Sequence, residues 1–202
     1  MTDSEIITAI KDVFLAFAAI TTASVALLGL KSWKRELKGK AEFEVARSLL
    51  KETYRVRDQL SYARNPMTLA HEFPDGYNPL PGKYDAKASA EAHGYAFTNR
   101  WKPVVEAVQT YEVVLLEAEA IWGDKIKTKC TELRRCCLQM NRSMKKIVDD
   151  IASDGRKFEG YEHITEKARD DVWSMDDDEL SLKIQSAVKE IEDYLRPHIK
   201  RN

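Results

Sequence analysis

The chain has 202 residues, which is enough for a membrane anchor and one further domain with its own hydrophobic core. Its 32 Lys and Arg residues nearly balance its 33 Asp and Glu residues, so no strong overall field attracts nucleic acid and no nucleic-acid partner is expected. The three cysteines, Cys130, Cys136 and Cys137, are odd in number and lack C-x-x-C spacing, a pattern that favours reduced thiols over a disulfide framework or a zinc site.

The longest uncharged stretch lies near the N-terminus. Residues 13–30 contain no charged residue, no proline and no Asn, Gln or His over 18 positions. This is about the minimum length for a helix that crosses a hydrocarbon core, so residues 1–31 are predicted to be an N-terminal tail and a single transmembrane helix. Two alternatives stay open. A cleaved signal peptide is disfavoured by the acidic Asp3 and Glu5, and a core helix of a soluble bundle would show a more polar face.

Basic residues flank this stretch unevenly and predict its orientation. Lys11 alone precedes it, whereas five basic residues follow between positions 31 and 40. Because Lys and Arg resist translocation, the C-terminal part is predicted to be cytoplasmic and the N-terminus to lie outside. The predicted membrane-interface residues are Lys31, Trp33, Lys34, Arg35 and Lys38.

The lipid bilayer is therefore the first expected partner. Within the stretch, Ala18, Thr22 and Ala26 are small residues spaced four apart, a pattern found where transmembrane helices associate. A homo-oligomer through the span is accordingly a second expectation.

The remainder, residues 32–202, is predicted to be one cytoplasmic helical bundle domain. Its first segment, residues 32–64, has apolar residues at spacings of three and four and continues the span as a long stalk helix. Asn65-Pro66 ends that helix, because the residue before a proline is pushed out of the helical region.

Residues 65–86, called the strap below, contain four prolines and two glycines and are predicted to be an ordered loop packed on the helices. The strap is longer than a helix connection requires and too apolar for a disordered linker. It is therefore also the predicted recognition surface for a protein partner, with Phe73, Tyr77 and Tyr84 as the partner-binding residues.

Two heptad stripes typical of coiled coils follow the strap. They lose phase only at Gly123-Asp124, which predicts an antiparallel hairpin with Asp124 as N-cap of its second helix. The first helix begins either near Asn99 or, with Pro103 inside it, around Ser89. The stripes are Phe97, Trp101, Val104, Val108, Tyr111, Leu115, Ala118 and Trp122, and Ile126, Cys130, Leu133, Cys137, Met140, Met144, Ile147 and Ile151.

Beyond the hairpin, residues 153–155 (Ser-Asp-Gly) end its second helix. Residues 158–173 are predicted to be irregular with at most a short helix over 165–172. A last helix opens at an acidic run in which Asp176 and Glu179 have capping-box spacing, and Pro197 is predicted to end it. The fold class is thus all-α: a transmembrane helix continuing into a stalk, an antiparallel hairpin and a C-terminal helix, forming an approximately four-helix bundle.

The sequence contains no recognisable catalytic, cofactor-binding or metal-binding motif. His71-Glu72 lacks the spacing to His93 or His163 that zinc sites use, so neither cofactor nor metal is expected. The cysteines lie on or beside an apolar stripe and are predicted to be core residues. The second hairpin helix is basic and the first acidic, which predicts charge pairing between them, with a lipid or nucleic-acid patch as the alternative.

Four stretches resemble an uncharacterised family of small bacterial inner-membrane proteins with one N-terminal span and a helical cytoplasmic domain: residues 33–60, 70–77, 117–123 and 194–199. The resemblance covers most of the chain, and the second and third stretches are its most specific parts. It implies a bacterial inner-membrane location and carries over no activity.

These patterns favour a membrane-anchored interaction or scaffold protein that binds a protein partner at the cytoplasmic membrane face. One alternative is a signalling component, for instance in stress or phage defence, that works through self-association of the span. The other is an enzyme with a site between the strap and the bundle, where His71, Glu72, Asp75 and His93 would converge.

Overall fold

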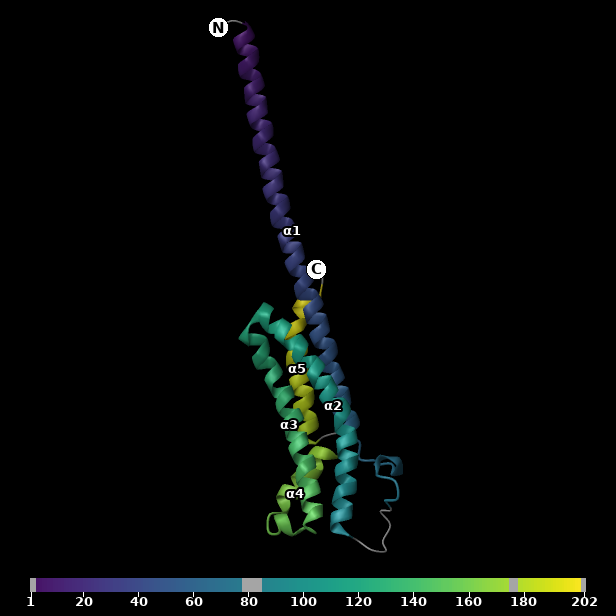
Figure 1. The fold of residues 1–202 in the computed structure, drawn as a ribbon. Helices are drawn as coiled ribbons and strands as arrows, with labels where there is room; N and C mark the ends of the chain where they lie inside the picture. Colours follow the sequence, from purple (N-terminus) through teal and green to yellow (C-terminus); the bar gives the residue numbers. More distant parts are fainter. Residues whose placement is uncertain (1–2, 78–84, 175–177, 201–202) are drawn as a thin grey trace. The chain divides into compact units, whose positions relative to one another are not determined.

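The computed structural model describes residues 3–77, 85–174 and 178–200 (Figure 1). These residues form helices and short turns with no strand among them, so the predicted all-α class is confirmed. The elements are α1 (Asp3–Ala63), the 3-10 turn η1 (Ala70–Glu72), α2 (Ala86–Trp122), α3 (Asp124–Ala152), the 3-10 turn η2 (Arg156–Phe158), α4 (Glu162–Val172) and α5 (Glu179–Ile199).

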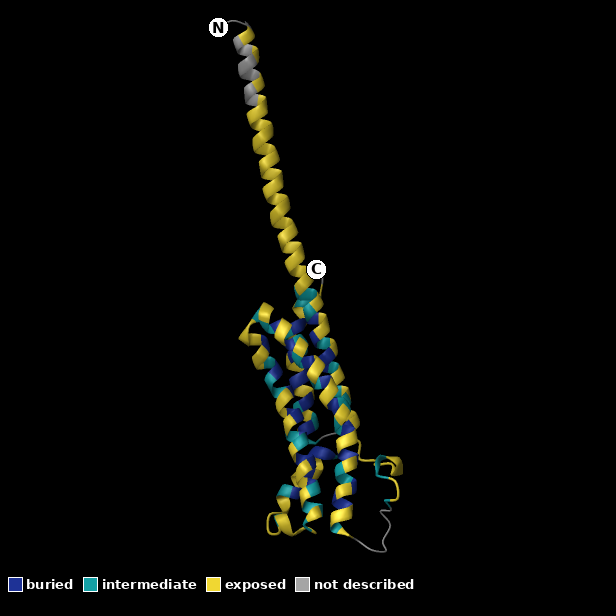
Figure 2. Ribbon diagram, in the orientation of Figure 1, coloured by how far each residue is buried: buried dark blue, intermediate teal, exposed yellow. Residues whose placement is uncertain are grey.

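The long N-terminal helix belongs to two compact units, residues 1–44 and 45–202. In the first unit every residue from 14 to 41 is exposed (Figure 2). Packing within the chain therefore begins in the middle of α1, and the predicted boundary at residues 31 and 32 falls inside a continuous helix. The helix ends at Ala63, as the Asn65-Pro66 pair predicted.

The apolar part of α1 is the one helical segment among the described residues that is long and apolar enough to cross a membrane, with a mean hydropathy of 1.8. None of its most apolar window is buried within the chain, whereas the core helix of a soluble bundle would be mostly buried. Its few polar side chains bond within the helix. The hydroxyls of Thr21, Thr22 and Ser24 donate to carbonyls four residues earlier at 2.9, 2.9 and 2.8 Å, which satisfies them without water.

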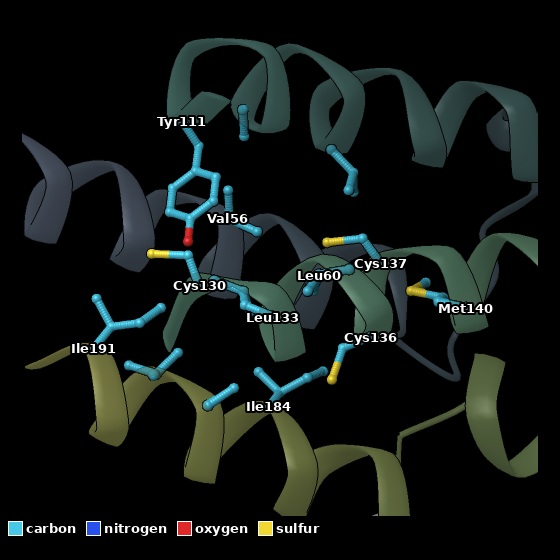
Figure 3. Close-up of a cluster of buried hydrophobic side chains, with 14 of the residues drawn as sticks. Val56, Leu60, Tyr111, Cys130, Leu133, Cys136, Cys137, Met140, Ile184 and Ile191 are labelled. Atoms are coloured by element: carbon cyan, nitrogen blue, oxygen red, sulfur yellow. The ribbon is translucent and has the colours of Figure 1, made fainter. Parts of the chain in front are cut away.

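The second unit is a bundle of four long helical segments. Residues 45–63 of α1 lie with α2, α3 and α5 around one hydrophobic core, and α4 packs against α3 and α5. Figure 3 shows this core, to which α1 contributes Val56 and Leu60 and α5 contributes Ile184 and Ile191. The predicted bundle of approximately four helices is confirmed.

The predicted hairpin forms the centre of this bundle. Gly123 separates α2 from α3 and adopts a φ of 65°, a left-handed conformation that glycine adopts without steric cost. Because Gly123 itself is the N-cap residue of α3, the prediction of Asp124 as N-cap is wrong: Asp124 lies inside the first turn, where its charge still favours the positive end of the helix dipole.

The start of α2 decides between the two predicted beginnings. The helix begins at Ala86, after Asp85 accepts hydrogen bonds from the amides of Lys87 and Ala88 at 2.9 and 3.4 Å. The start near Asn99 is therefore wrong, and Pro103 lies inside a longer helix, close to the alternative that began around Ser89.

The C-terminal third follows the predicted order with shifted ends. The second hairpin helix, α3, ends at Ala152, and α4 begins at Glu162, earlier than the short helix predicted from 165. The N-cap of α5 is Asp178, while Asp176 lies outside the described residues. Pro197 does not end α5, because a proline in the last turn removes only one of the helix's final hydrogen bonds.

Candidate functional site

A buried arginine fastens the strap to the bundle. The Arg100 side chain of α2 is 5% exposed and donates to the carbonyls of Asn65 at 2.5 Å and Met67 at 2.7 Å. The same guanidinium forms a two-point ion pair with Glu72, in which Nε donates to Oε2 and Nη2 donates to Oε1 at 3.0 Å. The first half of the strap is thus held at three positions by one side chain.

The pairing also settles what Glu72 can do chemically. The hydrogen bond from Arg100 is the largest reason that the pKa of Glu72 lies below its usual range, and it outweighs the burial that acts in the opposite direction. Glu72 is therefore a paired anion at neutral pH. It faces Arg100 and not His93, while His71 and Asp75 are exposed, so the convergence that an enzyme site would need is not formed by these residues.

Two of the predicted partner-binding residues pack on α2. Phe73 lies 5.1 Å from the Tyr77 ring and 5.4 Å, edge to face, from the His93 ring. The Tyr77 hydroxyl lies 3.2 Å from Ser89 Oγ. Phe73 and Tyr77 are therefore half-buried, and the third predicted residue, Tyr84, lies outside the described residues.

In the described part of the strap, the exposed apolar surface comes instead from two aliphatic side chains. Met67 is 68% exposed and Leu69 is 47% exposed. The backbone of both residues is fixed by hydrogen bonds. The Met67 carbonyl accepts from Arg100, and the Leu69 amide donates to Glu72 Oε1 at 3.1 Å. They are apolar groups presented to solvent on a fixed backbone.

An apolar groove of about 430 Å³ lies between α2 and α3, next to the strap's aromatic contacts. Phe97 joins the two, because its ring lines the groove and lies 6.4 Å from the His93 ring. The remaining lining residues are Gly94, Thr98 and Trp101 of α2 and Asn141, Met144, Lys145, Val148 and Asp149 of α3. Such a groove, mostly apolar with charges at its rim, suits an apolar side chain of a partner.

A second buried arginine ties the end of the stalk to the C-terminal helices. The Arg64 side chain is 2% exposed and donates to the Asp171 carbonyl at 2.8 Å and to Asp178 Oδ1 at 2.7 Å. Burial raises the pKa of Asp178, but hydrogen bonds from Ser181 and Arg64 outweigh it, and the net direction is downward. This network is structural: it joins α1, α4 and α5.

The cysteines are core residues. Cys130, Cys136 and Cys137 are free and buried, and burial raises the pKa of the first two thiols to about 11 and of the third to about 12. They are therefore protonated at neutral pH and poor nucleophiles. The Tyr111 hydroxyl points toward Cys130 inside the core (Figure 3). No three His, Cys, Asp or Glu side chains of the described residues are grouped as a metal site would require.

The predicted membrane-interface residues all lie on the exposed surface of α1 in the first unit. Trp33 is 58% exposed, and Lys38 pairs with Glu42 at 3.7 Å. The others are Lys31, Lys34 and Arg35. They thus form an exposed basic and aromatic segment directly after the apolar stretch.

Sequence reasoning missed both buried arginines. A signal was present, because Arg64 follows Leu60 by four positions and Arg100 precedes Val104 by four, which places each charge on an apolar stripe. Comparison with family models, curated proteins and solved structures finds no match for this chain.

Proposed function

We propose that this chain is a single-pass protein of the bacterial inner membrane whose cytoplasmic helical bundle acts as an interaction or scaffold protein for a protein partner. The observation that carries the proposal is that none of the most apolar window of α1 is buried within the chain. Exposed side chains such as Phe14 and Phe17 leave this apolar surface in water. Transfer to lipid removes that cost, at roughly 25 cal/mol for each Å².

The orientation rests on charge. Basic residues follow the apolar stretch and only Lys11 precedes it, which favours a cytoplasmic C-terminus. The buried, unpaired cysteines are compatible with the reducing cytoplasm. The resemblance of residues 70–77 and 117–123 to small bacterial inner-membrane proteins supports the same location.

Reporter fusions test the anchor and its orientation together. A reporter that works only in the cytoplasm, fused after Asn202, should be active and should stay with the membrane pellet after alkaline carbonate washing. Activity of a periplasmic reporter at the same position would contradict the orientation. Recovery of a shortened chain in the soluble fraction would instead point to a cleaved signal peptide.

The strap and the neighbouring apolar groove are the proposed recognition surface. Phe73 and Tyr77 pack between the strap and α2. The partner would therefore contact Met67 and Leu69, which are exposed and held on a fixed backbone. Apolar anchors with little conformational freedom contribute strongly to interfaces.

A matched pair of double variants tests this surface. Met67→Ser with Leu69→Ser should abolish capture of proteins that copurify from detergent-solubilised membranes, with an unchanged melting temperature. The control is Val113→Ser with Leu116→Ser, which removes two exposed apolar residues from α2 and should leave capture intact. Equal capture by both variants would overturn the strap as the recognition surface and leave the anchor proposal untouched.

Self-association of the span is the second candidate, as in a signalling or defence component. It is favoured by Ala18, Thr22 and Ala26, which are all exposed on α1. Replacing the three by Leu should lower chemical cross-linking of the chain in membranes if helices meet there. Unchanged cross-linking would exclude that face.

A further inference from the structure

A second groove, here called the basic groove, lies on the other side of α3, where α4 ends and α5 begins. Its volume is about 460 Å³, and among the residues that the structure describes five cationic side chains and one carboxylate line it. The cations are Arg135, Arg142 and Lys146 of α3, Lys167 of α4 and Lys183 of α5, and the remaining lining residues are Leu138, Gln139, Ser143 and Asp171.

The α3 residues reach this groove because of their spacing. Arg135, Gln139, Arg142 and Lys146 follow one another at intervals of four, three and four, which is one face of a helix. Charge pairing with α2 uses other basic residues of α3, as predicted: Lys127 pairs with Glu119 at 3.1 Å and Arg134 with Glu112 at 2.6 Å. The α3 cations that line the basic groove, Arg135, Arg142 and Lys146, take no part in this pairing.

Two of these cations have no ion pair among the residues that the structure describes. Arg142 and Lys146 are exposed and face no carboxylate within ion-pair distance in that part of the chain. Lys167 and Lys183 are both held by Glu179, each at 2.6 Å, and Arg135 is held by Glu132 at 3.1 Å. Asp176 and Asp177 lie outside the described residues.

The carboxylate among the described lining residues, Asp171, lies at the floor of the groove and offsets one of the five positive charges. Asp171 is 4% exposed, and it accepts from the Ser143 hydroxyl at 2.6 Å and from the Gln139 amide at 2.8 Å. Its backbone carbonyl accepts from Arg64. The floor is thereby built of buried, mutually bonded polar groups, and the cations stand around it.

We propose that the basic groove binds a small anion bearing phosphate groups. Several positive charges around one open volume repel each other. A multiply charged anion bound among them attracts each cation and offsets that repulsion. Phosphate oxygens match both the planar fork of Arg142 and the point charge of Lys146. The volume admits a diphosphate or a phosphate ester, and the lining cations come from three helices.

An extended polyanion fits less well. Glu132 and Glu179 flank the groove and would repel phosphates beyond its edges. The chain as a whole has a net charge of -1, so no overall field attracts a polyanion. A phosphate-bearing ligand could be a soluble metabolite or the headgroup of an anionic lipid, and these sources share the same chemistry.

Inorganic pyrophosphate is a direct probe. The full chain in phosphatidylcholine nanodiscs should bind radiolabelled pyrophosphate saturably, more weakly as salt rises, and with a higher melting temperature when bound. Arg142→Ala with Lys146→Ala should weaken binding by at least about tenfold, since it removes two charge-assisted contacts. The control, Lys125→Ala with Lys189→Ala, removes the same charge from exposed positions outside the groove and should change binding less than about twofold.

Two lipid compositions separate the sources. If lipid headgroups occupy the groove, adding phosphatidic acid to the nanodiscs should displace pyrophosphate from the natural chain; if the ligand is soluble, pyrophosphate binding should not change. Absence of saturable pyrophosphate binding in phosphatidylcholine nanodiscs would overturn the proposal. So would equal loss in the groove variant and the control, because that result would mean diffuse charge attraction without a site.

Discussion

The apolar groove and the basic groove border the same helix, α3, and have similar volumes of about 430 and 460 Å³, but the first is mostly apolar and the second is lined by five cations. The apolar groove is lined by residues that also belong to the core, such as Phe97 and Met144. The basic groove is lined by long exposed side chains around a small buried floor. One helix thus presents two surfaces suited to different ligands.

The difference teaches where stability and binding are coupled. Phe97 and Met144 of the apolar groove and Phe73 and Tyr77 of the strap contribute to packing, so changing any of them alters both properties, unlike the exposed Met67 and Leu69. Cations of the basic groove are solvated, and exposed charges contribute little to the folded state. Core substitutions on the apolar side of α3 should therefore lower the free energy of unfolding far more than substitutions of the groove cations on its basic side.

The core strip of α3 between the two sides should give the largest effect. Leu133 is fully buried, and its replacement by Ala should lower the free energy of unfolding by about 2–5 kcal/mol through lost burial and the cavity left behind. Leu138→Ala is the matched control, since Leu138 on the same helix is 56% exposed and should change stability by about 0.5 kcal/mol or less. Urea unfolding of the full chain in detergent, followed by circular dichroism, measures both. Similar values would mean that α3 is not packed as described.

Removing the strap's clamp should cost nearly as much. Arg100→Met keeps the aliphatic volume but leaves Glu72 and the carbonyls of Asn65 and Met67 without their donor. We expect a loss of about 3 kcal/mol, as for other broken buried ion pairs. Hydrogen exchange in residues 65–77 should rise by more than in α3. If exchange rose equally in both regions, the arginine would hold the whole bundle and not the strap in particular.

The hairpin and the Arg100 clamp differ in how far the sequence predicts them. The hairpin of α2 and α3 was predictable, because two consecutive helices that pack together each carry a heptad stripe, and a glycine separates them. Leu115 belongs to the stripe of α2 and Ile126 to that of α3. The clamp was not predictable, because the acceptors of Arg100 are backbone carbonyls that only the folded strap presents. Its sign in the sequence is a charged residue on an apolar stripe.

For the candidate sites, too, the sequence predicts some features and not others. The apolar content of the strap predicted that it is either a cover or a recognition surface, but not that Phe73 faces inward while Met67 faces out. A basic α3 was evident from composition. That Lys167 and Lys183 join its stripe depends on how α4 and α5 pack, and local periodicity does not record contacts between elements distant in sequence.

Acid should weaken the strap through Glu72. Because its folded-state pKa is lowered, the ion pair stabilises the fold above the unfolded-state pKa, and that contribution is lost as the pH falls through the folded-state value. Glu72→Gln should therefore be less stable than the natural chain at about pH 7, by about 1 kcal/mol, and the difference should shrink as the pH falls below the usual pKa range of a glutamate. Unfolding free energies across this range measure it. A difference independent of pH would mean that the carboxylate charge is not what Arg100 uses.

The smallest expected effect on stability lies in the basic groove. Arg142→Ala with Lys146→Ala removes two exposed cations that have no ion pair in the described part of the chain, and it relieves their repulsion. We expect the free energy of unfolding to change by about 0.5 kcal/mol or less, with any gain largest at low salt, where repulsion is least screened. Urea unfolding at low and high salt measures this. A loss above about 2 kcal/mol would show that these side chains support the fold. Stability and binding would then not be separable on the basic side of α3. A weaker pyrophosphate affinity of the same variant would then be explained by partial unfolding as well as by lost contacts.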